Sequence, residues 1–209
     1  MPTVADTLTD IERLQTEIEC RLRQGTIRQD AFVADLLNFT IILYFSWLSH
    51  HCLAKAQASI SLGRSPAVAK YYELFAQRPV LEEFIRWQNI AGLFVLWNIF
   101  EKFVRNTHGT LSTSVPSAIE DAYKAILKSR SIKAKEYDQM ITEFNLARLT
   151  RNSLHQGGIY SGKRVRRYVF RGVEYEFREG VKVRPIRLLD LASTFWEHYC
   201  RIVASNSAT

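Results

Sequence analysis

The chain has 209 residues, with 28 Lys and Arg against 21 Asp and Glu, and its formal net charge is +7. Its 47% apolar and 23% charged residues are typical of a folded globular domain and exclude a disordered chain, a collagen-like repeat and a disulfide scaffold. About 70% of the unfolded chain's surface is buried when a chain of this length folds, so neither a metal nor a crosslink is needed for stability.

Cysteine usage and the N-terminal sequence both favour a cytoplasmic protein. Cys20, Cys52 and Cys200 lie far apart with no C-x-x-C spacing, which disfavours a zinc site and leaves one thiol unpaired, as in a reducing compartment. The first ten residues lack the basic start and apolar run of a secretory signal. Residues 31–48 are apolar enough to suggest a membrane helix, but Asp35 and Asn38 interrupt them, and a central acidic side chain costs about 3 kcal/mol. We expect a buried helix there.

Helical patterns fill the chain up to about Arg105, interrupted near Gly25, Gly63, Pro66, Pro79 and Gly92. The first predicted helix, about Leu8–Gln24, is amphipathic, with apolar residues at helical spacing. The following three are expected at about Arg28–Ile60, between the breaks near Gly63 and Pro79, and at about Val80–Asn106.

Two of these predicted helices are apolar around their whole circumference, over residues 36–48 and 90–100. Such a helix must be covered on every side, and a domain of this size rarely surrounds two of them by itself. We therefore expect a homodimer or a larger assembly.

The second half is predicted to begin with a Thr/Ser-rich loop, Thr110–Pro116, followed by helices at about Ser117–Ser129 and Lys133–His155. The second of these should stop at Gly157 and Gly158, since glycine supplies a left-handed helix end. From Lys163 the apolar period changes from about 3.6 to 2, which predicts a β-hairpin over 163–184 with turns near Gly172 and Gly180.

Pro185 then opens a last helix, Ile186 to about Ala204, before a tail at 205–209 that we expect to be frayed. The predicted fold is all-α: one domain spanning 1–209, a bundle of five to six helices with a small β-hairpin insertion before the C-terminal helix.

A cationic cluster is the strongest candidate for chemistry, because nucleotide-binding loops, hydrolase elbows and zinc-helix motifs are all absent from the sequence. On a helix with Arg148 at 0°, Arg151 falls at about −60°, His155 at about −20° and Asn152 at about 40°. Two guanidiniums and an imidazole thus share one sector. This arrangement would attract an anion, and phosphate fits the geometry of arginine best.

Such a cluster suits metal-free cleavage of RNA, in which the neighbouring 2′-hydroxyl attacks phosphorus and a 2′,3′-cyclic phosphate forms. Histidine would act as general base or acid, and arginine would stabilise the charged transition state. We expect no cofactor and no metal. A simpler interpretation stays open, in which Arg151 and His155 only stabilise the negative end of their helix.

The segment that carries this cluster runs Arg151-Asn152-Ser153-Leu154-His155-Gln156-Gly157-Gly158. Late in a helix of an all-helical chain, it resembles the signature of the HEPN superfamily (higher eukaryote and prokaryote nucleotide-binding domains): arginine, four to six residues, then histidine, with a polar residue after the arginine. Arg151 has the polar follower Asn152 but only three intervening residues. Arg148 has six, but Leu149 follows it.

The resemblance implies a helical fold that dimerises through its motif helices and a metal-independent endoribonuclease of toxin–antitoxin, anti-phage or RNA-processing systems. It implies that Arg151 and His155 are catalytic, with Arg148 and Asn152 assisting. A neutralising antitoxin or regulatory partner would fit such an activity. The alternative is a HEPN-like module that binds RNA or a nucleotide without cutting it, and a third possibility is a structural helical protein whose apolar helices bind a partner.

The predicted hairpin is strongly basic, with nine Lys and Arg against three Glu over residues 163–187. Its candidate RNA-binding residues are Lys163, Arg164, Arg166, Arg167 and Arg171. Interleaved aromatic residues could stack on bases. Equally, the same alternation describes an ordinary hairpin with aromatics on the core face and solvated arginines outside.

Three other features are weaker candidates. Residues 105–109 imitate the main motif but are expected to form a helix stop. Glu101 would pair with an arginine of the motif helix or, more simply, lie exposed beside Lys102. His50 and His51 lack a nearby third metal ligand and are assigned to surface or packing.

Overall fold

The computed structural model describes residues 4–60, 78–112 and 118–205, and it describes side chains within 5–49, 86–112 and 118–205. The helices are α1 (Val4–Arg23), α2 (Ala31–Ile60), α4 (Arg78–Leu111), α5 (Ile119–Ser129), α6 (Ala134–His155) and α7 (Leu188–Ala204), and the strands are β1 (Arg166–Phe170) and β2 (Val173–Phe177). This part of the chain is mostly helical with one two-stranded sheet, which confirms the all-α class. The third predicted helix, the side chains of His50, Cys52 and His51, and most of the expected frayed tail lie outside the described residues.

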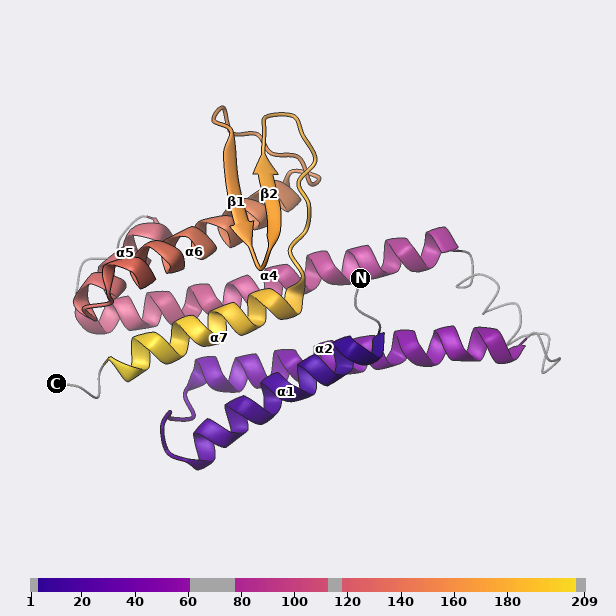
Figure 1. Ribbon diagram of the computed structural model, residues 1–209, viewed down its shortest axis with the longest axis horizontal. Coiled ribbons are helices and arrows are strands. Elements are labelled where there is room, and N and C mark those ends of the chain that lie inside the picture. Colours follow the sequence, from indigo (N-terminus) through magenta and orange to yellow (C-terminus); the bar gives the residue numbers. More distant parts are fainter. Residues whose placement is uncertain (1–3, 61–77, 113–117, 206–209) are drawn as a thin grey trace.

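The helices form two layers (Figure 1). In that view α1 and α2 lie side by side below, α4, α6 and α7 lie above them, and the hairpin projects upward beyond α6 and α4. Helix α4 is the central element, since it contacts α2, α5, α6 and α7. Its Phe100 stacks on Phe195 of α7, with ring centroids 4.0 Å apart, and also meets Tyr123 of α5 and Phe144 of α6.

The amphipathic patterns place their apolar faces as predicted. In α1, Ile11, Leu14 and Ile18 are buried, and the glutamates lie outside. Helix α2 begins three residues later than expected because the Asp30 carboxylate accepts a hydrogen bond from the backbone N–H of Val33, at 3.0 Å, and so caps the first turn.

The apolar stretch of α2 is covered on one side only. Residues 31–49 are long and apolar enough to cross a membrane, and about 33% of the best window is buried inside the chain. Ile41, Ile42 and Phe45 are exposed, although α1 and α4 pack against the opposite face. The expectation of a helix buried within its own chain is therefore only partly met.

The predicted helix stop at Arg105–Gly109 is wrong, since α4 continues to Leu111. Two contacts carry the helix through this segment. Glu101 accepts two hydrogen bonds from Arg105 one turn later, and His108 is buried on the same side as Val104. Glu101 also accepts a hydrogen bond from the Trp97 indole, so its partners lie on its own helix and not on α6.

The hairpin forms where the change of period predicts it, and its two strands pair antiparallel, with Arg166 opposite Phe177 and Phe170 opposite Val173. Arg171 and Gly172 at the turn both have positive φ, 48° and 74°, as a two-residue hairpin loop of type I′ requires. Gly180 makes a second turn with φ 74°, again as predicted.

The end of α6 is joined to the base of the hairpin by Gly158. Its N–H donates to the Ser153 carbonyl at 2.9 Å, which closes the helix, and its carbonyl accepts from the Val183 N–H at 2.8 Å. Gly157 and Gly158 have φ of 72° and 86°, so the predicted glycine stop is confirmed.

A buried polar network links α5, α6 and α7. The His198 ring is 1% exposed; its Nε2 lies 2.8 Å from a Glu143 oxygen and its Nδ1 lies 2.9 Å from the Tyr123 hydroxyl. If Nε2 donates to the carboxylate, Nδ1 of a neutral ring accepts from the phenol, and all three groups are satisfied. Burial alone would raise the pKa of Glu143, but hydrogen bonds from His198 and Gln139 and the charges of His198 and Arg201 outweigh it and lower the pKa.

We predict that His198→Phe lowers the free energy of unfolding by about 1–3 kcal/mol at pH 7, because it removes one of the two hydrogen bonds to the Glu143 carboxylate and leaves the buried Tyr123 hydroxyl without a partner. The Glu143 contribution is complete above the unfolded pKa of about 4.3 and is lost as the pH falls through the lower folded pKa. Denaturant unfolding between pH 7 and pH 3 should therefore show the gap between parent and variant narrowing in acid. Tyr123→Phe should cost less, and a constant gap across this range would contradict the network.

Candidate functional site

The residues of the predicted cationic cluster contact two different helices that pack against α6, namely α4 and α5. Arg151 and His155 both contact Phe94 of α4: the Arg151 guanidinium carbon lies 5.9 Å from the ring centroid, and the His155 ring centroid lies 4.2 Å from it. Arg148 turns instead toward α5, where it pairs with Glu120 at 3.1 Å. Helical spacing put all three in one sector, and their partners on other helices separate Arg148 from the other two.

Arg151 is a half-buried cation, and not all of its hydrogen-bond donors have a partner among the described residues. Its Nη1 donates to the Asn152 side-chain oxygen at 3.0 Å, whereas its Nε is buried and makes no hydrogen bond within the described residues. A guanidinium stays charged at any physiological pH and offers five donors. The arrangement leaves donors of Arg151 available to an anion, and Asn152 fixes the orientation of the guanidinium plane.

His155 lies in the last turn of α6 with an exposed side chain. No hydrogen bond from its ring nitrogens is found among the described residues, so both nitrogens are open to solvent or substrate. Contact with Phe94 holds one face of the ring. A ring held in this way, beside a half-buried guanidinium, can exchange a proton with a ligand bound to the arginine.

Arg148 is neutralised more fully. Besides Glu120, it meets the Asn145 side-chain oxygen through Nη2 at 3.0 Å. Burial would raise the pKa of Glu120, but the hydrogen bond from Lys124 and the positive charge of Arg148 lower it below the ordinary value. Glu120 therefore remains ionised and holds Arg148 against α5.

The hairpin contributes basic groups of two kinds. Lys163 and Arg164 are exposed and form no ion pair in the described part of the chain. Arg167 pairs with Glu176 across the strands, and Arg171 pairs with Glu197 of α7, at 3.2 and 2.9 Å. A hydrogen bond with the Tyr168 hydroxyl raises the pKa of Arg166.

The aromatic residues of the hairpin face the core. Phe170, Tyr175 and Phe177 are buried, and only Tyr168 is half-buried. This matches the ordinary-hairpin interpretation of the alternating pattern, so base stacking on these three rings is not available. The exposed cations that form no ion pair among the described residues remain for a polyanion, and they include Lys163 and Arg164 before the strands and Lys182 and Arg184 after them.

Phe94 and Glu120 shape the cluster, and sequence reasoning missed both. Phe94 sits inside a continuous apolar run and Glu120 in the first turn of a separate helix, so neither carries a local signal of contact with α6.

Comparisons of the chain with protein-family models, with curated proteins and with solved structures find no match.

The two arginines should differ in their effect on stability. We predict that Arg148→Gln lowers the free energy of unfolding by about 0.5–1 kcal/mol, because it removes a partly buried ion pair between α5 and α6. Arg151→Gln should change it by less than about 0.5 kcal/mol, since the Arg151 guanidinium has no carboxylate partner in the described residues. Chemical denaturation of both variants provides the comparison, and a reversed order would show that the Glu120 pair is not the structural contact.

Proposed function

We propose that the chain is a metal-independent endoribonuclease of HEPN type, with Arg151 and His155 as catalytic residues. The observation that carries the proposal is the convergence of Arg151 and His155 on Phe94, which brings a guanidinium without a carboxylate partner among the described residues beside an exposed imidazole. The sequence resemblance described above supports the same assignment. A role in a toxin–antitoxin or anti-phage system in the cytoplasm, with a neutralising partner, belongs to this proposal.

In the proposed reaction His155 takes the proton of the ribose 2′-hydroxyl, and the 2′-oxygen forms a bond to the adjacent phosphorus. The bond from phosphorus to the 5′-oxygen breaks, and that oxygen gains a proton from a general acid. The products are a 2′,3′-cyclic phosphate and a 5′-hydroxyl. Arg151 stabilises the charge that builds on the phosphoryl oxygens, while Asn152 orients it.

Arg148 is given an assisting role, because Glu120 and Asn145 already occupy its guanidinium. RNA is held by exposed basic residues of the hairpin, chiefly Lys163 and Arg164, with Arg166, Arg167 and Arg171 adding to the local positive potential. The hairpin follows α6 in the sequence and is fastened to the end of α6 through the Gly158 hydrogen bonds, which supports a role for these cations near the cluster.

The proposed active form is a homodimer. Ile42 and Phe45 of α2 are 66% and 60% exposed, and Trp87 and Val95 of α4 are exposed as well. Between the two helices lies an apolar groove of about 250 Å³. Val95 is the neighbour of Phe94, so a second copy seated on this surface would lie close to His155 and could complete the site.

Cleavage should be measured on labelled RNA in EDTA with the parent protein, His155→Ala and Arg151→Ala. We expect the parent to yield 2′,3′-cyclic phosphate ends and each variant to lose at least about 100-fold in rate, as removal of a general base or of a charge-stabilising donor does. Arg148→Gln should retain more activity than Arg151→Gln. Cleavage that survives both alanine substitutions refutes the assignment.

A different result would select the non-catalytic alternative. Salt-sensitive RNA binding without cyclic phosphate product, weakened by Lys163→Gln and Arg164→Gln, would identify a binding module. Circular dichroism of each variant shows whether the fold is retained.

Oligomeric state provides an independent check. Ile42→Glu and Phe45→Glu place a charge on the exposed apolar surface, and burying an unpaired charge in an interface is strongly unfavourable. We predict that the parent sediments as a dimer and that each variant sediments as a monomer. Ala125→Glu, at an exposed position of α5, is the matched control and should leave the dimer intact. A monomeric parent protein would contradict the dimer.

A further inference from the structure

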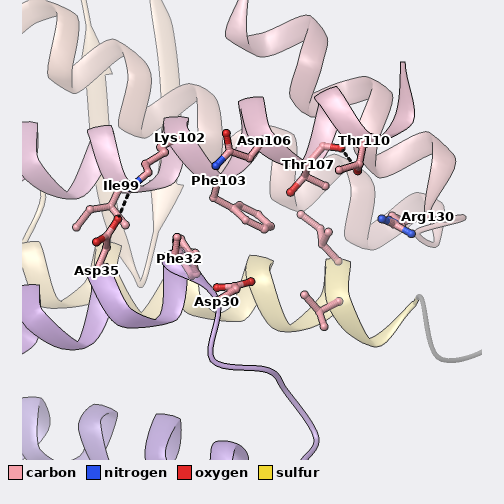
Figure 2. A pocket seen from close by; sticks show the side chains of 13 residues that line it. Asp30, Phe32, Asp35, Ile99, Lys102, Phe103, Asn106, Thr107, Thr110 and Arg130 are labelled. Atoms are coloured by element: carbon pink, nitrogen blue, oxygen red, sulfur yellow. Dashed lines mark hydrogen bonds and ion pairs between the residues drawn. The ribbon is translucent and has the colours of Figure 1, made fainter. Parts of the chain in front are cut away.

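A cavity of about 320 Å³ lies at the end of the bundle away from Phe94 and His155, and neither residue lines it. It is enclosed by the first turns of α2, the second half of α4, the turn between α5 and α6, and the end of α7. Figure 2 shows the side chains of Lys102, Asn106 and Thr107 approaching it from α4, Asp30 and Asp35 from α2, and Arg130 from the opposite side.

Both acidic groups of this cavity already have partners. Asp35 pairs with Lys102 at 3.0 Å, across α2 and α4. Asp30 caps α2 through the Val33 N–H and accepts a hydrogen bond from the Tyr199 hydroxyl at 2.9 Å. A carboxylate at a helix N-terminus is stabilised further by the helix dipole. Neither acid needs a cation from a ligand.

Arg130 is a cation of this cavity without an ion pair within the described residues. Its Nε is buried, so the donors that a ligand can reach are the two terminal nitrogens, which make no hydrogen bond to the described residues. A guanidinium keeps its charge and can offer these donors to an anion. In Figure 2 the guanidinium lies at the edge of the cavity and faces the space below α4.

One neutral donor on α4 lies between Phe103 and Arg130 in Figure 2. The Thr107 side chain lines the cavity and makes no hydrogen bond to the described residues. Its hydroxyl can donate to an oxygen held by Arg130, whereas the Asn106 amide points away, toward Lys102. The planar fork of arginine matches carboxylate and phosphate oxygens in pairs, so this group of donors favours an oxyanion.

Apart from Thr110, whose hydroxyl donates to the Thr107 carbonyl, the remaining lining is apolar and includes Phe103, Ile99 and Ile202. A ligand that fills the cavity must therefore carry an apolar body beside its anion. The volume lies near the lower end of the roughly 300–1,000 Å³ range of small-molecule sites, which suits one small molecule and excludes a nucleic-acid strand.

We propose that this cavity binds a small organic anion, a carboxylate or phosphate on an apolar body, whose oxygens pair with Arg130. Thr107 donates to the same anion, and Phe103 packs against the body. The site is separate from the proposed nuclease site and does not depend on it.

The test is calorimetric titration of the full chain with phenyl phosphate and with benzoate. At least one should bind saturably at one site per chain, and Arg130→Gln should weaken that binding about tenfold or more, because a charge-assisted hydrogen-bond pair is lost. Lys128→Gln removes an exposed charge from the same helix end without touching the cavity, and it should leave the affinity unchanged. Which probe binds more tightly distinguishes a phosphate ligand from a carboxylate.

Inorganic phosphate tests the apolar part, and it should bind more weakly than phenyl phosphate. Arg130→Lys, which keeps the charge but loses the planar fork, should fall between the parent and Arg130→Gln. Equal binding by the parent and Arg130→Gln overturns the proposal, as does the absence of saturable binding of both anionic probes. RNA cleavage has no part in this readout, so the two proposals can fail separately.

Discussion

The stacking of Phe100 on Phe195 holds α4 in the centre of the bundle, with the ring centroids 4.0 Å apart and the planes within 8° of parallel. Tyr123 and Phe144 meet the same ring, so one side chain of α4 is in contact with α5, α6 and α7. Arg151 and His155 contact Phe94 on this helix, and the cavity that Arg130 borders is lined by Thr107 farther along it. Both sites therefore depend on the position of a single helix.

Much of the fold follows from periodicity. Strong apolar spacing places α1, α6 and α7, and the change to a period of two places the hairpin, because each pattern has a buried and a solvated face. The end of α4 was mispredicted for a physical reason. A glycine beside a histidine resembles a helix end, yet at Gly109 the ladder continues, supported by the Glu101–Arg105 pair and buried His108. That support comes from contacts that a local pattern does not contain.

In the candidate site, too, local sequence patterns predict positions along one helix but not contacts between helices. Helical geometry correctly joins Arg151 and His155 on one side of α6, but it cannot show that Glu120 on another helix binds Arg148. The hairpin's alternation was compatible with two interpretations, and burial of Phe170, Tyr175 and Phe177 decides which way the rings face. Arg130 belongs to no sequence motif. It was not predicted as a site residue because the cavity that it lines is formed by three helices that are distant from it in the sequence.

Gly158 makes two backbone attachments, one through its N–H and one through its carbonyl. Its N–H ends the helix that carries His155, and its carbonyl fastens the chain segment that returns from the hairpin. With φ at 86°, a residue with a Cβ would strain both attachments at once. A pull on the basic hairpin is thus transmitted directly to the last turn of α6. The position of the His155 imidazole and that of the hairpin cations are therefore coupled through Gly158.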